Sequence, residues 1–121
     1  MSLKPRPISA TEAELVRWLL TQAARIDGTE SLSSQVESLL VAERCDCGCP
    51  SVEFLVEGLS ATASIIAEAG GHSPEGIPVG VVLWGRAGRL SGLEVYDLGD
   101  ASIISLPRPA VLRATSLISG E

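Results

Sequence analysis

The sequence contains few aromatic residues, a single lysine and a single histidine, and no long hydrophobic run. Trp18, Phe54, Trp84 and Tyr96 are its only aromatic residues, so the core must be aliphatic and each aromatic marks a core or a pocket. No apolar run approaches the ~18–20 residues of a membrane-spanning helix, so we expect no membrane contact. Residues 1–10 also lack the hydrophobic stretch of a signal peptide.

Positive charge is scarce as well. Nine basic residues stand against 15 acidic residues, which gives a net charge of −6, and no Lys/Arg cluster interrupts the acidic background. Such a balance repels phosphate backbones, so we expect no nucleic-acid binding. An acidic surface favours solubility and can attract a basic protein partner. The composition is also compatible with a homo-oligomer.

The cysteine count is odd, which argues against a disulfide framework and favours a cytoplasmic protein. With 45% hydrophobic and 20% charged residues, the chain is too apolar for disorder. We therefore expect one domain over residues 1–121, with a flexible lead over 1–8 and a flexible tail over 116–121.

All three cysteines, Cys45, Cys47 and Cys49, lie within five residues around Gly48. Three thiolates in a bent loop can hold zinc, and His72 is the only histidine available as a fourth ligand. However, the spacing lacks the paired C-x₂-C of a zinc ribbon, and free cysteines often pack as small hydrophobic residues. A buried turn without cofactor is the interpretation we favour, and a zinc site, a disulfide or a reactive thiol are the alternatives.

The N-terminal segment predicts an amphipathic helix. Capping boxes at residues 9–12 and 11–14 mark two candidate starts, and Leu15, Leu19 and Ile26 form an apolar stripe at helical spacing. Asp27-Gly28 predicts its end. This apolar stripe must be buried, so we expect the helix to pack against a flat surface such as a sheet.

Strands dominate the rest of the sequence. Residues 31–38 can form a short helix, and we favour a strand over 39–44, then strands over 51–57 and 63–68 and a final edge strand over 111–115. The composition of 70–76 predicts a mobile loop.

The clearest hairpin joins residues 79–84 and 90–96. Gly88 suits the left-handed position of a three-residue turn with a bulge, so Gly85 should pair with Arg89, and Trp84 with Leu90. One face of this hairpin is then aliphatic. The other face carries two glycines, Gly80 and Gly92, each opposite a larger side chain on the other strand. We expect the N-terminal helix to pack on that face, and the alternative is a ligand hollow there; the candidate residues of the hollow are Gly80, Trp84, Gly92, Glu94 and Tyr96.

The segments Cys47-Gly-Cys-Pro-Ser-Val52, Gly80-Val-Val-Leu83 and Leu93-Glu-Val-Tyr96, with a later Leu106-Pro107, resemble an uncharacterised family of small bacterial proteins. The stretch from Gly92 to Pro107 is also similar to parts of immunity proteins that neutralise bacterial toxins. The first resemblance implies no activity, and the second implies a protein partner.

These patterns together predict an α+β fold in which an N-terminal helix packs on a mostly antiparallel sheet of four or five strands, built from hairpins. We expect a non-enzymatic binding domain, with an immunity-type protein as one form of it. The alternative is a small metal-binding or thiol-dependent protein centred on Cys45, Cys47 and Cys49.

Overall fold

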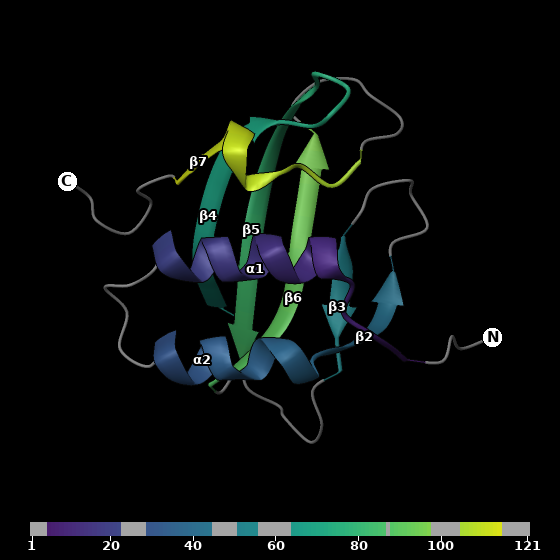
Figure 1. Ribbon diagram of the computed structural model, residues 1–121, viewed down its shortest axis with the longest axis vertical. Helices are drawn as coiled ribbons and strands as arrows, with labels where there is room; N and C mark the ends of the chain where they lie inside the picture. Colours follow the sequence, from purple (N-terminus) through teal and green to yellow (C-terminus); the bar gives the residue numbers. More distant parts are fainter. Residues whose placement is uncertain are drawn as a thin grey trace.

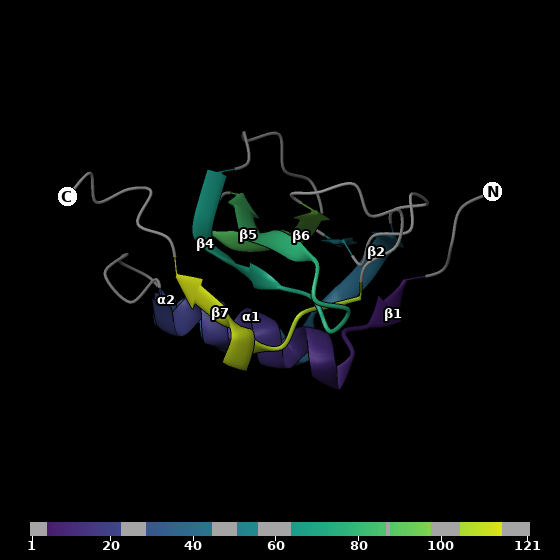
Figure 2. The same ribbon diagram turned by 90° about the horizontal axis from the view of Figure 1, so that it is seen from above.

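The computed structural model describes residues 5–22, 29–44, 51–55, 64–86, 88–97 and 105–114. Two helices lie on one side of an antiparallel sheet, which makes the fold α+β as predicted (Figures 1 and 2). The sheet has seven strands in the order β1-β2-β3-β6-β5-β4-β7, so the predicted four or five strands were too few. The strand that no pattern predicted is β1, an edge strand of two residues, which is too short to carry a hydrophobic pattern of its own.

The strands are bounded as follows. The seven strands are β1 (Arg6–Pro7), β2 (Leu40–Arg44), β3 (Val52–Phe54), β4 (Ser64–His72), β5 (Pro78–Arg86), β6 (Arg89–Asp97) and β7 (Leu112–Ala114). Strands β1 and β7 form the two edges of the sheet, and β1 falls within the predicted lead. The final edge strand was therefore predicted correctly. Residues 56–57 of the strand predicted over 51–57 and the predicted tail over 116–121 lie outside the described residues.

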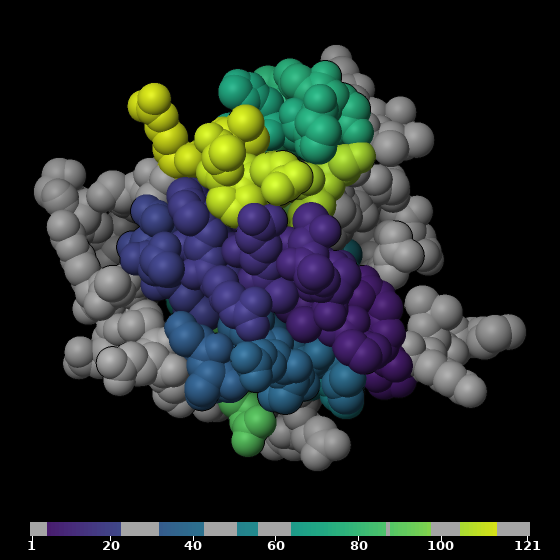
Figure 3. Space-filling view, viewed as in Figure 1, coloured from purple at the N-terminus to yellow at the C-terminus, as the bar shows by residue number. Residues whose placement is uncertain are grey.

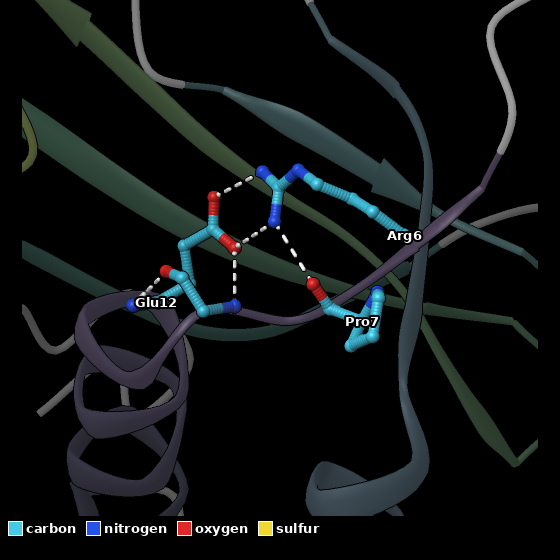
Figure 4. A network of polar contacts seen from close by, with 4 residues as sticks. Arg6, Pro7 and Glu12 are labelled. Atoms are coloured by element: carbon cyan, nitrogen blue, oxygen red, sulfur yellow. Dashed lines mark hydrogen bonds and ion pairs between the residues drawn. The ribbon is translucent and has the colours of Figure 1, made fainter.

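Helix α1 (Ala10–Gln22) begins at the first of the two predicted capping boxes. The Ser9 hydroxyl accepts a hydrogen bond from the Glu12 amide at 3.1 Å, and the Glu12 carboxylate accepts one from the Ser9 amide at 3.0 Å. Figure 4 shows that Arg6 also reaches this carboxylate, donating at 3.1 and 2.8 Å, and donates to the Pro7 carbonyl. Strand β1 and the start of α1 are thereby joined through one buried glutamate.

The core forms where α1 crosses the strands. Leu15, Val16 and Leu19 of the predicted stripe are fully buried, and Trp18 is half-buried against the same cluster. From the sheet, this cluster receives the aliphatic side chains of the central strands: Val79, Val81, Leu83, Leu93 and Val95. A helix packed on the sheet and the aliphatic face of the hairpin were therefore both predicted correctly, but the expectation that the helix would cover the glycine-bearing face was wrong, because α1 packs on the aliphatic face.

Two segments flank α1 on this side of the sheet. Helix α2 (Thr29–Gln35) continues into the 3₁₀ turn η1 (Val36–Ser38), and a second 3₁₀ turn, η2 (Pro109–Val111), leads into β7. Figure 3 shows α1 lying between α2 and the segment that carries η2. Both proposals for residues 31–44 were partly right, because the short helix and the strand follow one another.

The predicted loop over 70–76 was wrong in its first half. Gly70, Gly71 and His72 belong to β4, and the turn to β5 is formed only by residues 73–77. Gly71 is opposite Leu112, and a Cβ at this glycine would overlap the Val111 carbonyl oxygen. The close approach of β7 thus requires glycine within the strand, which composition alone suggested was a loop.

The turn at residues 73–77 is fixed by side-chain hydrogen bonds. The Glu75 carboxylate accepts hydrogen bonds from the hydroxyl and, at 3.2 Å, the amide of Ser105. The hydroxyl bond from Ser105 comes first among the causes that lower the pKa of Glu75 to about 2. The contact links the β4–β5 turn to the segment that leads into β7.

The hairpin β5–β6 exists, but its predicted register was wrong. Arg86 pairs with Arg89 across a two-residue loop, and Trp84 pairs with Gly92 rather than Leu90. The bulge lies within β6 rather than in the loop, at Ser91, which has no opposite residue on β5. Because of this bulge, the side chain of Leu90 points into the core on the helix side of the sheet. Gln35 of α2 fixes this turn, because its amide donates to the Gly88 carbonyl at 2.9 Å and accepts from the Leu90 amide at 3.1 Å.

Candidate functional site: the far face of the sheet

We call the side of the sheet opposite α1 and α2 the far face. Side chains alternate along a strand, so the residues between the buried aliphatic ones point to this side. None of the described helices lies over it (Figure 2). Its central residues are Glu53, Glu68, Gly70, Gly80, Val82, Trp84, Gly92, Glu94 and Tyr96.

Trp84 and Glu94 form the polar contact at the centre of the far face. The indole Nε1 donates to Glu94 Oε1 at 3.0 Å. The two residues are diagonal neighbours on adjacent strands, a separation that a long aromatic side chain can bridge. Gly92 stands directly opposite Trp84, so no side chain there obstructs the indole. The two-residue loop and the bulge at Ser91 together set this diagonal, because each shifts β6 against β5 by one residue relative to the predicted register.

Tyr96 occupies one half of the predicted hollow. It is opposite Gly80, and a Cβ on Gly80 would overlap the phenol ring at Cζ and Oη. The ring therefore lies on the glycine backbone, as aromatic residues often do beside a strand glycine. Tyr96 nevertheless remains 40% exposed, which presents an aromatic surface to solvent.

The other half of the hollow lies over Gly92. The nearest described atom to the position of a Cβ on Gly92 is the Val52 carbonyl oxygen, at 3.4 Å. Glu53 of β3 and Trp84 of β5 are the cross-strand neighbours of this glycine. The two glycines therefore lie in different cross-strand rows of the sheet. The structure also brings Glu53 next to Gly92, a neighbour that the sequence pattern did not predict.

Carboxylates surround these aromatic residues. Glu53 and Glu94 are exposed, and Glu68 shares a cross-strand row with Val82 and Glu94. Aromatic rings attract cations through their electron-rich faces, and carboxylates bind guanidinium and ammonium groups. The arrangement can therefore bind a cationic group.

Of the predicted metal ligands, only His72 lies within the described residues. His72 is the exposed last residue of β4, whereas the cysteine segment follows β2 and precedes β3. Strands β6 and β5 lie between β3 and β4, so three strand spacings, about 14 Å, separate the two strands. Cys45, Cys47 and Cys49 lie outside the described residues, and their metal binding stays a prediction. Within the described ranges, no group of three His, Cys, Asp or Glu side chains could hold a metal ion.

The comparisons with known proteins add no relative. No protein-family model, no curated protein and no solved structure matches this chain. In the part of the chain that the structure describes, no helix has the length and apolar character to span a membrane.

Proposed function

We propose that this protein is a non-enzymatic interaction domain that binds a basic protein partner through its far face. The observation that carries the proposal is the Trp84–Glu94 pair beside the exposed Tyr96, with Glu53 on the neighbouring strand. The net charge of −6 adds a long-range attraction for a cationic partner.

Arginine is the residue that best fits this surface. Its planar guanidinium can stack on an aromatic ring and pair with a carboxylate at the same time. Glu94 uses Oε1 for the indole, so Oε2 can accept from an incoming guanidinium. The hydrogen bond from Trp84 also orients the carboxylate before the partner arrives, which reduces the entropy lost on binding.

The similarity of residues 92–107 to toxin-immunity proteins suggests one kind of partner, a basic toxin. An acidic inhibitor associates rapidly with a basic toxin because opposite charges steer the encounter. Such an inhibitor needs an exposed surface of matching charge rather than a catalytic group.

The proposal can be tested before any partner is known. An oligoarginine peptide is titrated into the ¹⁵N-labelled protein, and an oligoglutamate peptide serves as the charge-reversed probe. We expect oligoarginine to give its largest shifts at the Trp84 indole N–H and at the amides near Trp84 and Glu94, and oligoglutamate to leave the Trp84 indole N–H unshifted. The affinity should fall as salt is added, because exposed charges are screened.

Glu94→Gln and Glu37→Gln form a matched pair of variants. Both remove one negative charge, but Glu37 lies in η1 on the helix side of the sheet, where it is paired with Arg17 at 3.9 Å. Glu94→Gln should weaken peptide binding about fivefold, as expected for the loss of an exposed charge contact of about 1 kcal/mol. Equal weakening in the two variants would mean that net charge alone attracts the peptide and would overturn the proposal.

A further inference from the structure

The end of the β5–β6 hairpin brings two arginines together, and neither has a counter-ion among the described residues. Arg86 and Arg89 are directly opposite each other, and both point to the far face because their neighbours Gly85 and Leu90 face the core. Residues in such a pair have Cβ atoms about 5 Å apart, and like charges at this distance repel. Neither guanidinium forms an ion pair with any residue that the structure describes.

The other side of the molecule behaves differently. Arg6, Arg17 and Arg108 each lie within 4 Å of a glutamate, at 2.8, 3.9 and 3.7 Å. In a protein with 15 acidic residues, two opposed arginines without an ion pair to any described carboxylate therefore need an explanation.

Arg86 supplies a second and independent observation. Its Nε is the only buried side-chain nitrogen or oxygen in the described ranges that has no hydrogen-bond partner. A buried donor without an acceptor is costly, and an acceptor atom supplied by a ligand would remove that cost. The donor lies on the same side chain that faces Arg89.

The scaffold beneath the pair is fixed. Gln35 bonds the Gly88 carbonyl and the Leu90 amide from the helix side, and Gly88 adopts the left-handed conformation with φ at +81°. The two arginines therefore flank a turn that Gln35 anchors at its loop and at the start of β6, so little further ordering of the backbone is needed to bind a ligand.

We propose that Arg86 and Arg89 form a binding site for a small oxyanion, specifically a phosphate group. Two guanidiniums balance the double charge of phosphate, and Arg86 Nε gains the acceptor that it lacks. A monocarboxylate carries half that charge and binds more weakly. The site is independent of the proposed basic partner, because it uses the positive end of the far face rather than its carboxylates.

The test uses inorganic phosphate and acetate in separate titrations at constant ionic strength. We expect phosphate to shift the Nε–H resonance of Arg86 saturably and acetate to do so far more weakly. Arg86→Gln and Arg89→Gln should each weaken phosphate binding at least about tenfold. Arg113→Gln is the matched control, because Arg113 is an exposed far-face arginine on β7 without an ion pair among the described residues, and it should leave the affinity unchanged.

Thermal unfolding provides a second readout that does not depend on assigned resonances. Phosphate should raise the melting temperature of the native protein and of Arg113→Gln, but not that of Arg89→Gln, because a ligand stabilises only the state that binds it. In phosphate-free buffer, Arg89→Gln should melt no lower than the native protein, since it removes a repulsion. A linear shift at every arginine, equal binding of acetate, or unchanged binding in Arg89→Gln would overturn the assignment.

Discussion

Glu12 shows how one residue can fix the entry to a helix. Its carboxylate accepts hydrogen bonds from Arg6 and from the Ser9 amide, while its own amide donates to the Ser9 hydroxyl. Burial by itself raises the pKa of Glu12, but the hydrogen bonds and the charge of Arg6 outweigh it and leave the pKa below its ordinary value. The ionised form is therefore the one that stabilises the fold.

Glu12→Gln should lower the free energy of unfolding by about 1–2 kcal/mol at neutral pH, because it removes a buried charge-assisted contact. A depressed pKa contributes stability above the ordinary pKa and loses it as the pH falls through the folded value. The difference from the native protein should therefore shrink below about pH 4. Urea unfolding across pH measures it.

Glu14→Gln is the control for this prediction. Glu14 lies on the same helix but is exposed, at 3.7 Å from Arg108. Its loss should change stability by less than about 0.5 kcal/mol, as for other surface sites. A cost equal to that of Glu12→Gln would show that the capping network adds nothing.

At the scale of elements, local sequence signals predicted α1 and the aliphatic face of β5–β6 because both depend on near neighbours in the chain. The hairpin register could not be predicted in this way. It depends on Gln35, which contacts Gly88 and Leu90 from a distant part of the sequence. The filling of the predicted hollow could not be predicted for the same reason, because the position of Tyr96 over Gly80 follows from that register.

The sequence could also have predicted the arginine pair, because a two-residue loop at Ala87-Gly88 places Arg86 opposite Arg89. The turn chemistry instead favours a three-residue loop, because an alanine at position 87 resists the positive φ of a two-residue turn. The anchoring contacts of Gln35 on this turn have no local signal.

The adjacent glycines of β4 give an element-scale prediction. A Cβ on Gly71 would overlap the Val111 carbonyl, whereas a Cβ on Gly70 would meet nothing closer than the Val79 carbonyl oxygen at 3.8 Å. Gly71→Ala should cost about 2–3 kcal/mol, because β7 must move away from β4. Gly70→Ala should change stability by less than about 1 kcal/mol.

Urea unfolding compares the two variants, and hydrogen exchange at Arg113 reports on the pairing of β7. Exchange there should accelerate in Gly71→Ala alone. Similar stability and exchange in the two variants would show that β7 does not depend on a close approach to Gly71.

At the scale of the whole molecule, the core bears on the cysteine segment. Side chains from α1, α2 and six strands form one buried cluster, with Leu15, Leu19, Leu83 and Leu93 at its centre. A cluster of this kind stabilises a domain through the burial of apolar surface, whereas proteins that need structural zinc unfold without it. The cysteine segment joins β2 and β3, whose pairing of Arg44 with Val52 already brings its ends together. Zinc would therefore contribute little that the sheet does not already provide.

We accordingly expect less than stoichiometric zinc after purification without chelator, and a melting temperature that a strong chelator changes by less than about 2 °C. Cys47→Ser should be tolerated better than Gly48→Val, because the segment must bend and glycine bends at least cost. Elemental analysis and thermal unfolding measure the two quantities. One zinc per chain, together with a chelator-induced drop of many degrees, would reverse this expectation and make the cysteine segment, rather than the far face, the first place to look for function.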